Sequence, residues 1–297
     1  MQIYNQNIYF KSYFGKTDIT DKSIKKDHVN NRTSFFRDCP TLDFVKNYIL
    51  KNFPNGTHIT DFGCSDGEET YSVAMMLAEN NKDLKYKITG YDISSTAIAR
   101  AKQGEYKIDL PDLALLEIER YPEISECECS HVLDRRIAKY RDIFRESFNV
   151  YVHKYRDRKG YDKRCTIKPG IVKDSVDFKV TSIFDIDTNK LDLPANTSVI
   201  IFKNSWYQLA PKAINEIITK VYQALPPKGI LVVGTFGEDH TLDGRTSLDK
   251  FPLARKLEDA GFKPIFYDSN SYEPGKNHKT GKTYEIRNDI PSVFMKV

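Results

Sequence analysis

The sequence predicts an α/β protein in which a parallel sheet is covered by helices on both faces. Short apolar runs typical of strands alternate with segments of helical periodicity along most of the chain. A glycine-containing turn joins the first of these strands to a long apolar helix. At 297 residues, the chain is long enough for one large α/β domain with an added arm or lobe.

Composition excludes several classes of protein. The chain is 40% hydrophobic and 29% charged, which is ordinary for a globular protein and too apolar for disorder. Its net charge of +4 is spread out, apart from a cluster within residues 153–173. This basic character is too weak to predict binding to nucleic acid, and a solvated basic face explains it better.

Targeting signals are also missing from the sequence. No apolar run approaches the length of a membrane span. The first ten residues, "MQIYNQNIYF", lack the basic start and apolar core of a signal peptide. Five scattered cysteines do not form a disulfide pattern. We therefore expect a cytoplasmic protein with no membrane insertion.

The expected elements follow in chain order. Residues 1–30 have no clear period and predict an arm or short helices. The next elements are a helix, strand, helix, strand and helix at residues 40–52, 57–63, 70–81, 86–93 and 94–104. The last of these helices has Ser94 or Ser95 as its N-cap and ends at Gly104. Later strands are predicted at residues 176–185, 197–204, 229–236, 263–268 and 290–297, with helices at 212–225 and 247–261.

Residues 107–175 interrupt this alternation. The first half of this stretch is charged and helical in pattern. The second half, residues 148–168, alternates around a glycine turn near Gly160, as a hairpin does. We predict an inserted subdomain that contains β-structure.

The turn after the first strand carries the most informative chemistry. It reads "DFGCSDGEETYSVAMML" from Asp61. A dinucleotide fingerprint needs three glycines, and a P-loop needs Gly-Lys-Ser/Thr. This turn has only Gly63 and Gly67, and Glu68 and Glu69 follow at once. Two glutamates at a helix N-terminus would repel a phosphate.

A ligand that carries an amine and no phosphate fits the same residues. S-adenosylmethionine has a sulfonium and an α-amino group, which a carboxylate can pair with. Glycines let its methionine part lie against the backbone. Asp92 ends the next strand and fits an acid that accepts hydrogen bonds from ribose hydroxyls. The turn alone is weak support, since acids at a helix start also favour the helix dipole. Together with Asp92, it favours this cofactor.

Several blocks of the sequence resemble the CheR-type family, the chemotaxis-receptor methyltransferases, which methylate glutamate side chains with S-adenosylmethionine. The most specific is "GCSDGEETYSVAM" (63–75). The others are "NRTSFFRD" (31–38), "YDISSTAIARAKQGEY" (91–106), "VDFKVTSIFD" (176–185), "VIIFKNSWYQL" (199–209) and "LPPKGILVVGTFGE" (225–238). The resemblance implies a Rossmann-like class I methyltransferase sheet, with the 107–175 insertion in place of the family's small β-subdomain. It divides the chain into an arm at residues 1–40, which contributes to the cofactor site, and a methyltransferase domain at 41–297.

The resemblance also implies roles for individual residues. Those at the methionine end of the cofactor are Asn31, Thr33, Arg37 and Glu68, which takes the amino group. Asp92 takes the ribose, Ser182 and Ile183 flank the adenine, and Lys203 and Asn204 line the cofactor from the fourth strand. Asp61, Gly63 and Cys64 complete the cofactor turn, where Asp61 supports the turn and Cys64 is a packed small residue. Arg37 and Tyr207 are the expected catalytic residues.

Some positions depart from the family pattern or carry other readings. Lys203 stands where the family has arginine, Gln208 where it has tyrosine, and Ser182 where it has asparagine. Phe35 and Phe36 are expected in the core, and Trp206 or Tyr207 could face the sulfonium through a cation–π contact. Cys127, Cys129, His131 and Cys165 lack the spacing of a zinc site, so no metal is expected.

The predicted function is methyl transfer to a carboxylate on a protein. A glutamate acceptor is already ionised at neutral pH and needs no general base, which agrees with the absence of histidine from the matched blocks. Two alternatives stay open. The acceptor could be a small molecule or another protein group, or the chain could be a non-catalytic S-adenosylmethionine-binding sensor or partner module.

Overall fold

The computed structural model describes residues 35–80, 85–107, 146–157, 160–186, 191–203, 205–206, 209–234, 253–268, 275–276, 283–284 and 290–297. Within these ranges, a seven-stranded sheet has the order β6-β2-β1-β7-β8-β12-β9. Its strands are β1 (Thr57–Phe62), β2 (Tyr86–Asp92), β6 (Val176–Val180), β7 (Thr197–Ile201), β8 (Ile230–Val232), β9 (Phe262–Asp268) and β12 (Ile290–Lys296). The helices are α1 (Cys39–Asn52), α2 (Glu68–Asn80), α3 (Ser95–Gln103), α8 (Ile171–Asp174), α9 (Pro211–Ala224) and α11 (Leu253–Asp259).

The strand order confirms the predicted fold class and corrects one detail. The pairs β6–β2, β2–β1, β1–β7 and β7–β8 are all parallel. From β1 the chain first adds β2 and β6 on one side of the sheet, and then adds β7 and β8 on the other side. The last strand, β12, is antiparallel and lies between β8 and β9. The sheet is therefore mixed, because β12 runs opposite to both of its neighbours. This is the order of a Rossmann-like class I methyltransferase sheet.

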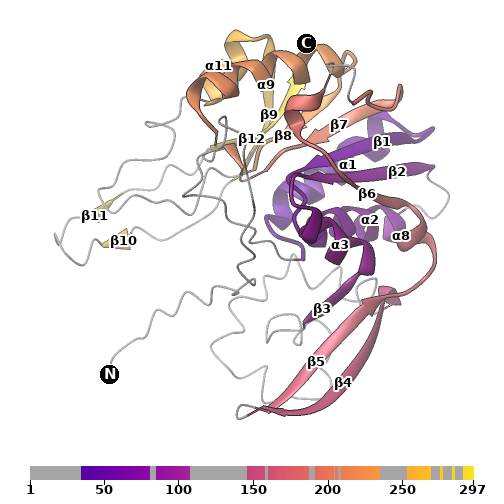
Figure 1. Cartoon of the computed structure of the whole chain (residues 1–297). Helices are drawn as coiled ribbons and strands as arrows, with labels where there is room; N and C mark the ends of the chain where they lie inside the picture. The colour runs from indigo at the N-terminus through magenta and orange to yellow at the C-terminus, as the bar shows by residue number, and fades with distance from the viewer. Residues whose placement is uncertain are drawn as a thin grey trace.

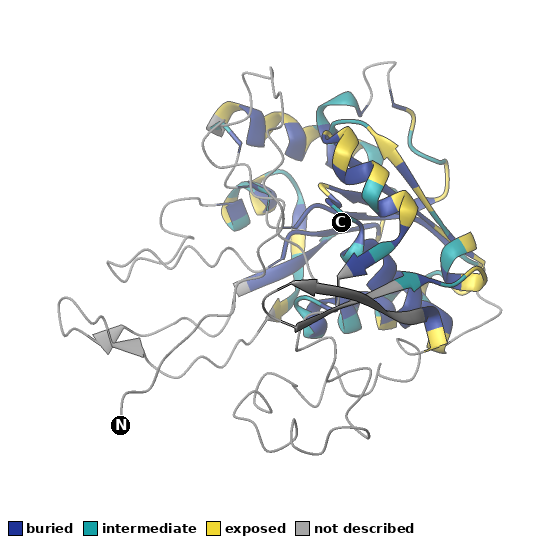
Figure 2. Cartoon of the chain, turned by 60° about the horizontal axis from the view of Figure 1, so that its bottom comes forward, coloured by how far each residue is buried: buried dark blue, intermediate teal, exposed yellow. Residues whose placement is uncertain are grey.

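Helices cover both faces of the sheet, as Figure 1 shows, with α1, α2 and α3 on one side and α9 and α11 on the other. Alternate residues of the central strands supply the two cores. In β7, Val199 and Ile201 join the core that contains residues of α1 to α3, and Ile200 joins the core that contains residues of α9 and α11. The central strands β1 and β7 are correspondingly buried throughout, and Figure 2 shows buried strands between the helices, which is the pattern of a parallel sheet covered on two faces.

Two predicted strands are shorter than expected. The run at 176–185 forms β6 only as far as Val180, and residues Ile183–Asp185 form a 3₁₀ turn, η3. Ser182 ends the strand because its hydroxyl accepts a hydrogen bond from the Phe184 N–H while the Asp185 carboxylate accepts one from the Ser182 N–H. This capping box competes with strand pairing. The run at 229–236 is a strand only at 230–232, and its last two residues lie outside the described ranges.

A separate three-stranded sheet forms part of the insertion. β4 (Phe148–Asp157) and β5 (Gly160–Ile167) are the predicted hairpin, and β3 (Glu105–Lys107) adds to its edge. Figure 1 shows this sheet below α3, away from the main sheet. Residues 108–145, which were expected to be helical, lie outside the described ranges. The two short strands β10 (Gly275–Lys276) and β11 (Thr283–Tyr284) pair with each other. Among the helices described, none combines the length and apolarity needed to cross a bilayer.

The N-cap of α3 is Ser94, and it provides a test of the local structure. Its hydroxyl accepts a hydrogen bond from the Ala97 N–H, and Gly104 ends the helix in the left-handed region at φ 64°. We predict that Ser94→Ala lowers the free energy of unfolding by about 1 kcal/mol, because an N-cap acceptor is lost. The exposed neighbour provides the control, and Ser95→Ala should change little. Urea denaturation measures both, and equal effects of the two variants would contradict this assignment.

Candidate cofactor site

The glycine turn (residues 63–67) lies where β1 ends, beside the carboxyl ends of β2 and β7. The strand order changes direction between β1 and β7, and ligands bind at such switch points in open α/β sheets. The backbone N–H groups of Gly63 and Cys64 both donate to the Tyr91 carbonyl, at 2.7 and 3.1 Å. The start of the turn is therefore fixed to the end of β2.

Both glycines of the turn are required by their surroundings. Gly63 has φ +71°, and a Cβ there would lie 2.8 Å from the hydroxyl oxygen of Ser205. Gly67 has φ +91°, and a Cβ there would lie 2.8 Å from the ring of Phe178. Any side chain at these positions would be strained and would clash. Gly63 is also exposed, so its backbone is open to a ligand.

Asp92 joins the turn to the end of β2. One carboxylate oxygen accepts the Ser94 N–H at 2.8 Å, and the other accepts the Ser65 N–H at 2.9 Å. Burial raises the pKa of Asp92, although these backbone donors act against the shift. Each oxygen has a second lone pair, so the carboxylate can accept further hydrogen bonds from hydroxyls of a ligand.

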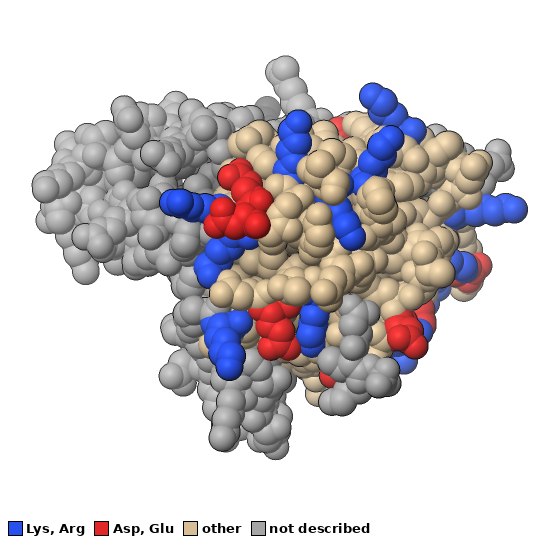
Figure 3. Space-filling model, turned by 90° about the horizontal axis from the view of Figure 1, so that it is seen from above, with Lys and Arg blue, Asp and Glu red and all other residues tan. Residues whose placement is uncertain are grey.

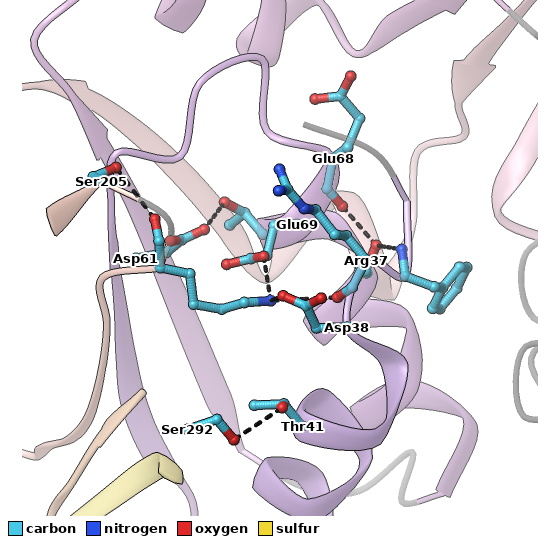
Figure 4. A network of polar contacts seen from close by, with 12 residues as sticks. Arg37, Asp38, Thr41, Asp61, Glu68, Glu69, Ser205 and Ser292 are labelled. Carbon is cyan, nitrogen blue, oxygen red and sulfur yellow. Dashed lines mark hydrogen bonds and ion pairs between the residues drawn. The ribbon is translucent and has the colours of Figure 1, made fainter. Parts of the chain in front are cut away.

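The two glutamates that follow the turn serve different functions. Glu69 is directed at the ammonium of Lys203, with 2.7 Å between Oε2 and Nζ. Glu68 is half-buried and is the first residue of α2. Figure 4 shows that its carboxylate points away from the network of polar contacts that contains Glu69. Glu68 is therefore the glutamate placed to pair with a ligand amine.

Lys203 lies in a cluster of buried charges. Its ammonium pairs with Asp38 Oδ2 at 3.2 Å and Glu69 Oε2 at 2.7 Å, and it donates to the Arg37 carbonyl at 3.3 Å. We call Lys203, Asp38 and Glu69 the Lys203 ion cluster. Burial alone would lower the pKa of Lys203, but the two carboxylates outweigh burial and the pKa is raised. Lys203 was expected to line the cofactor, and its charge is instead used inside the protein.

The segment at residues 35–38, the Arg37 turn, has an unusual backbone. Phe36 and Asp38 both lie in the left-handed region, at φ 54° and 53°. The Phe36 N–H donates to the Ser72 hydroxyl of α2 at 2.8 Å. A bulky left-handed residue persists only where its surroundings hold it, and such residues gather at functional sites. Figure 4 shows the Arg37 guanidinium and the Glu68 carboxylate on the same side of the network, away from Thr41 and Ser292.

The two phenylalanines of this turn are in the core, as the sequence predicts. Phe36 is buried, and Phe35 makes edge-to-face contacts with Tyr106 of β3 and Phe148 of β4, with centroids 4.9 and 5.2 Å apart. The Arg37 turn is thus attached to the small sheet on one side and to α2 on the other.

Asp61 lies beneath the glycine turn and is almost completely buried. The Thr70 hydroxyl donates to its carboxyl at 2.6 Å, so Asp61 supports the turn from inside. Burial, followed by the charge of Glu69, raises the pKa of Asp61 well above its ordinary value. Asp38 and Glu69 are already paired to Lys203, so a third negative charge on the buried Asp61 is unfavourable.

At the other end of the site, two exposed apolar side chains were missed by the sequence reasoning. Val180 is paired with Asp92 in the sheet and is 52% exposed, and Ile93, which follows Asp92, is 39% exposed. Apolar side chains left exposed beside the buried Asp92 suit the face of an adenine ring. The signal in the sequence is an apolar residue at the end of a strand, since Val180 is the last residue of β6 and Ile93 directly follows β2. Of the two predicted adenine neighbours, Ser182 is half-buried, whereas Ile183 packs in the core of α9 and α11.

Some predicted site residues are buried in the protein, and others lie outside the described ranges. Trp206 packs edge-to-face on Phe202 in the core, so it does not face a sulfonium. Cys64 is buried within the turn, and burial raises the pKa of its thiol, as expected of a packing residue. Asn31, Thr33, Asn204 and Tyr207 lie outside the described residues, as do Gln208, Cys127, Cys129 and His131.

The fold and the site define an S-adenosylmethionine-binding domain. The open glycine backbone, Glu68 and Asp92 fit the methionine amine and the ribose. Residues 31–127 match the family model "CheR methyltransferase, SAM binding domain". This match confirms the resemblance to CheR-type methyltransferases over those residues and makes S-adenosylmethionine the cofactor.

Curated relatives agree with the family match. A chemotaxis protein methyltransferase of Borreliella burgdorferi is 36% identical over 106 residues, covering 32% of this chain and 36% of that protein. One from Campylobacter jejuni subsp. jejuni is 31% identical over 102 residues, covering 33% of this chain and 38% of that protein. The aligned part thus spans little more than a third of the length of these relatives.

Solved structures of related architecture are more distant. A TehB-like SAM-dependent methyltransferase from Corynebacterium glutamicum has a TM-score of 0.41 at 14% identity, covering 85% of this chain and 86% of that one. The CurJ carbon methyltransferase also scores 0.41, at 13% identity, covering 88% of this chain and 55% of that one. Likeness at this level adds nothing to what the strand order establishes.

The raised pKa of Asp61 predicts a pH dependence. Between the ordinary aspartate pKa of about 3.9 and the raised value, the folded protein keeps a proton that the unfolded chain has released. Wild type therefore loses stability as pH rises through this window, whereas Asp61→Asn cannot titrate. We predict that the variant gains stability relative to wild type from about pH 4 towards pH 7. Urea denaturation across that range tests this, and a constant or opposite difference would contradict it.

Proposed function

We propose that the chain is an S-adenosylmethionine-dependent methyltransferase whose acceptor is a carboxylate on a protein. The observation that carries this proposal is the position of the Arg37 guanidinium, held by the Arg37 turn on the same side as Glu68. A planar guanidinium has five N–H donors on two edges, so it can bind the carboxylate of the cofactor along one edge and that of the acceptor along the other.

The chain's own residues divide the binding between them. Glu68 pairs with the amine of the cofactor, Asp92 accepts from the ribose, and Ile93 and Val180 contact the adenine. When bound, S-adenosylmethionine supplies a methyl group already activated by its sulfonium. The protein's part is therefore to orient two ligands rather than to activate a leaving group.

An ionised acceptor needs no general base. Among the described side chains, the histidine is His58, which lies near the amino end of β1 and bonds to the Thr89 hydroxyl at 2.9 Å. Burial and Lys179 lower the pKa of His58 to about 4. It lies at the opposite end of the strand from the glycine turn, and so it has no part in the site.

The face seen in Figure 3 does not show the basic stripe of a nucleic-acid-binding protein. The described lysines and arginines are spread over this face, with acids near its left and lower edges. A protein that tracks a phosphate backbone gathers its basic side chains into a patch or stripe.

Cofactor binding is tested by titration calorimetry with S-adenosylhomocysteine. We predict that wild type binds, and that Glu68→Gln and Asp92→Asn each weaken binding about tenfold or more, since each removes hydrogen bonds to a charged group. The control is Glu79→Gln, which changes an exposed glutamate in the same helix as Glu68 and should leave binding unchanged. Absence of binding by wild type would end the proposal.

The acceptor is tested by transfer of a radiolabelled methyl group to cell extract, followed by mild base. A carboxylate ester releases labelled methanol, so we predict base-labile label with wild type and none with Asp92→Asn. Base-stable label would assign a different acceptor. A wild type that binds the cofactor but transfers no label would identify a sensor or partner module instead.

A further inference from the structure

Lys203 is too far inside the protein to act on a ligand through its own charge. Its side chain is 2% exposed, and its ammonium contacts Asp38, Glu69 and the Arg37 carbonyl. Two of these three partners belong to the Arg37 turn, and the third belongs to α2. Lys203 therefore joins the end of β7 to two segments that flank the glycine turn.

The Arg37 turn needs such support because its backbone is strained. Phe36 and Asp38, on either side of Arg37, are both left-handed, a conformation that is uncommon for residues other than glycine and persists where the surroundings hold it. The contacts that hold the turn include the bond from the Phe36 N–H to Ser72 and the two contacts from Lys203. These contacts hold the backbone of the turn, and the backbone sets the direction in which the Arg37 side chain leaves it.

We propose that Lys203 is a positioning residue for Arg37, holding the Arg37 turn so that the guanidinium meets the carboxylate of the cofactor's methionine part. This inference rests on the proposed cofactor site and adds a role for a residue expected to line it. Lysine suits the role because its compact ammonium reaches two carboxylates and a carbonyl at once.

A pair of ligands separates positioning from general stability. S-adenosylhomocysteine carries the methionine-derived carboxylate, and 5′-methylthioadenosine lacks it. We expect Lys203→Met to weaken binding of S-adenosylhomocysteine about tenfold or more, as loss of a charge-assisted contact does. Binding of 5′-methylthioadenosine should change less than twofold, because Asp92 and the apolar adenine neighbours are untouched.

Asp38→Asn provides a second variant that keeps the buried Glu69–Lys203 pair. It weakens one of the two contacts by which Lys203 reaches the Arg37 turn and leaves the contact with the Arg37 carbonyl, so it tests the proposal even if Lys203→Met fails to fold. We expect the same selective loss. Asp43→Asn is the matched control, since Asp43 also pairs with a buried lysine, Lys46, at 2.9 Å, but within α1. It should bind both ligands as wild type does.

Double variants show whether Lys203 acts through Arg37. In an Arg37→Gln background, Lys203→Met and Asp38→Asn should cause no further loss of S-adenosylhomocysteine binding, whereas in a Glu68→Gln background the loss should persist. Equal weakening of both ligands, or full additivity with Arg37→Gln, would overturn the positioning role. Failure of wild type to bind S-adenosylhomocysteine would instead refute the proposed function.

Discussion

The ammonium of Lys203, buried between the carboxylates of Asp38 and Glu69, connects the parts of this site that are far apart in sequence. It joins the end of β7, the first turn of α2 and the segment that precedes α1. Removing one member of a buried ion pair costs roughly 3–5 kcal/mol, because the remaining charges lose their partner. The Arg37 turn is therefore held by this contact as well as by the packing of Phe35 and Phe36 in the core.

A consequence is that negative charge is distributed unequally around the glycine turn. Glu69 is neutralised by Lys203, Asp61 is buried with a raised pKa, and Asp92 is held by two backbone donors. The carboxylate of Glu68 is directed away from the Lys203 ion cluster (Figure 4). The site therefore suits a ligand with one amine and two ribose hydroxyls, and it is unsuited to a phosphate.

The fold could be predicted from the sequence because the strands are short apolar runs and the helices are strongly periodic. The exceptions have local or long-range causes: the Ser182 capping box shortens one strand, and the antiparallel placement of β12 depends on pairing with β8 and β9. In the site, Glu68 and Asp92 were predicted from their places at the start of a helix and the end of a strand, where the structure has α2 and β2. The role of Lys203 was not, because its partners Asp38 and Glu69 lie more than a hundred residues earlier.

The central claim is that Lys203 holds the Arg37 turn and the first turn of α2 as one unit. Hydrogen–deuterium exchange of the amides at residues 35–38 and 68–72, in wild type and Lys203→Met, tests it most directly. We predict faster exchange of both segments together in the variant, including the Phe36 amide that donates to Ser72, with no change in β9 and β12. Unchanged exchange of residues 35–38, or faster exchange throughout the domain, would contradict the account.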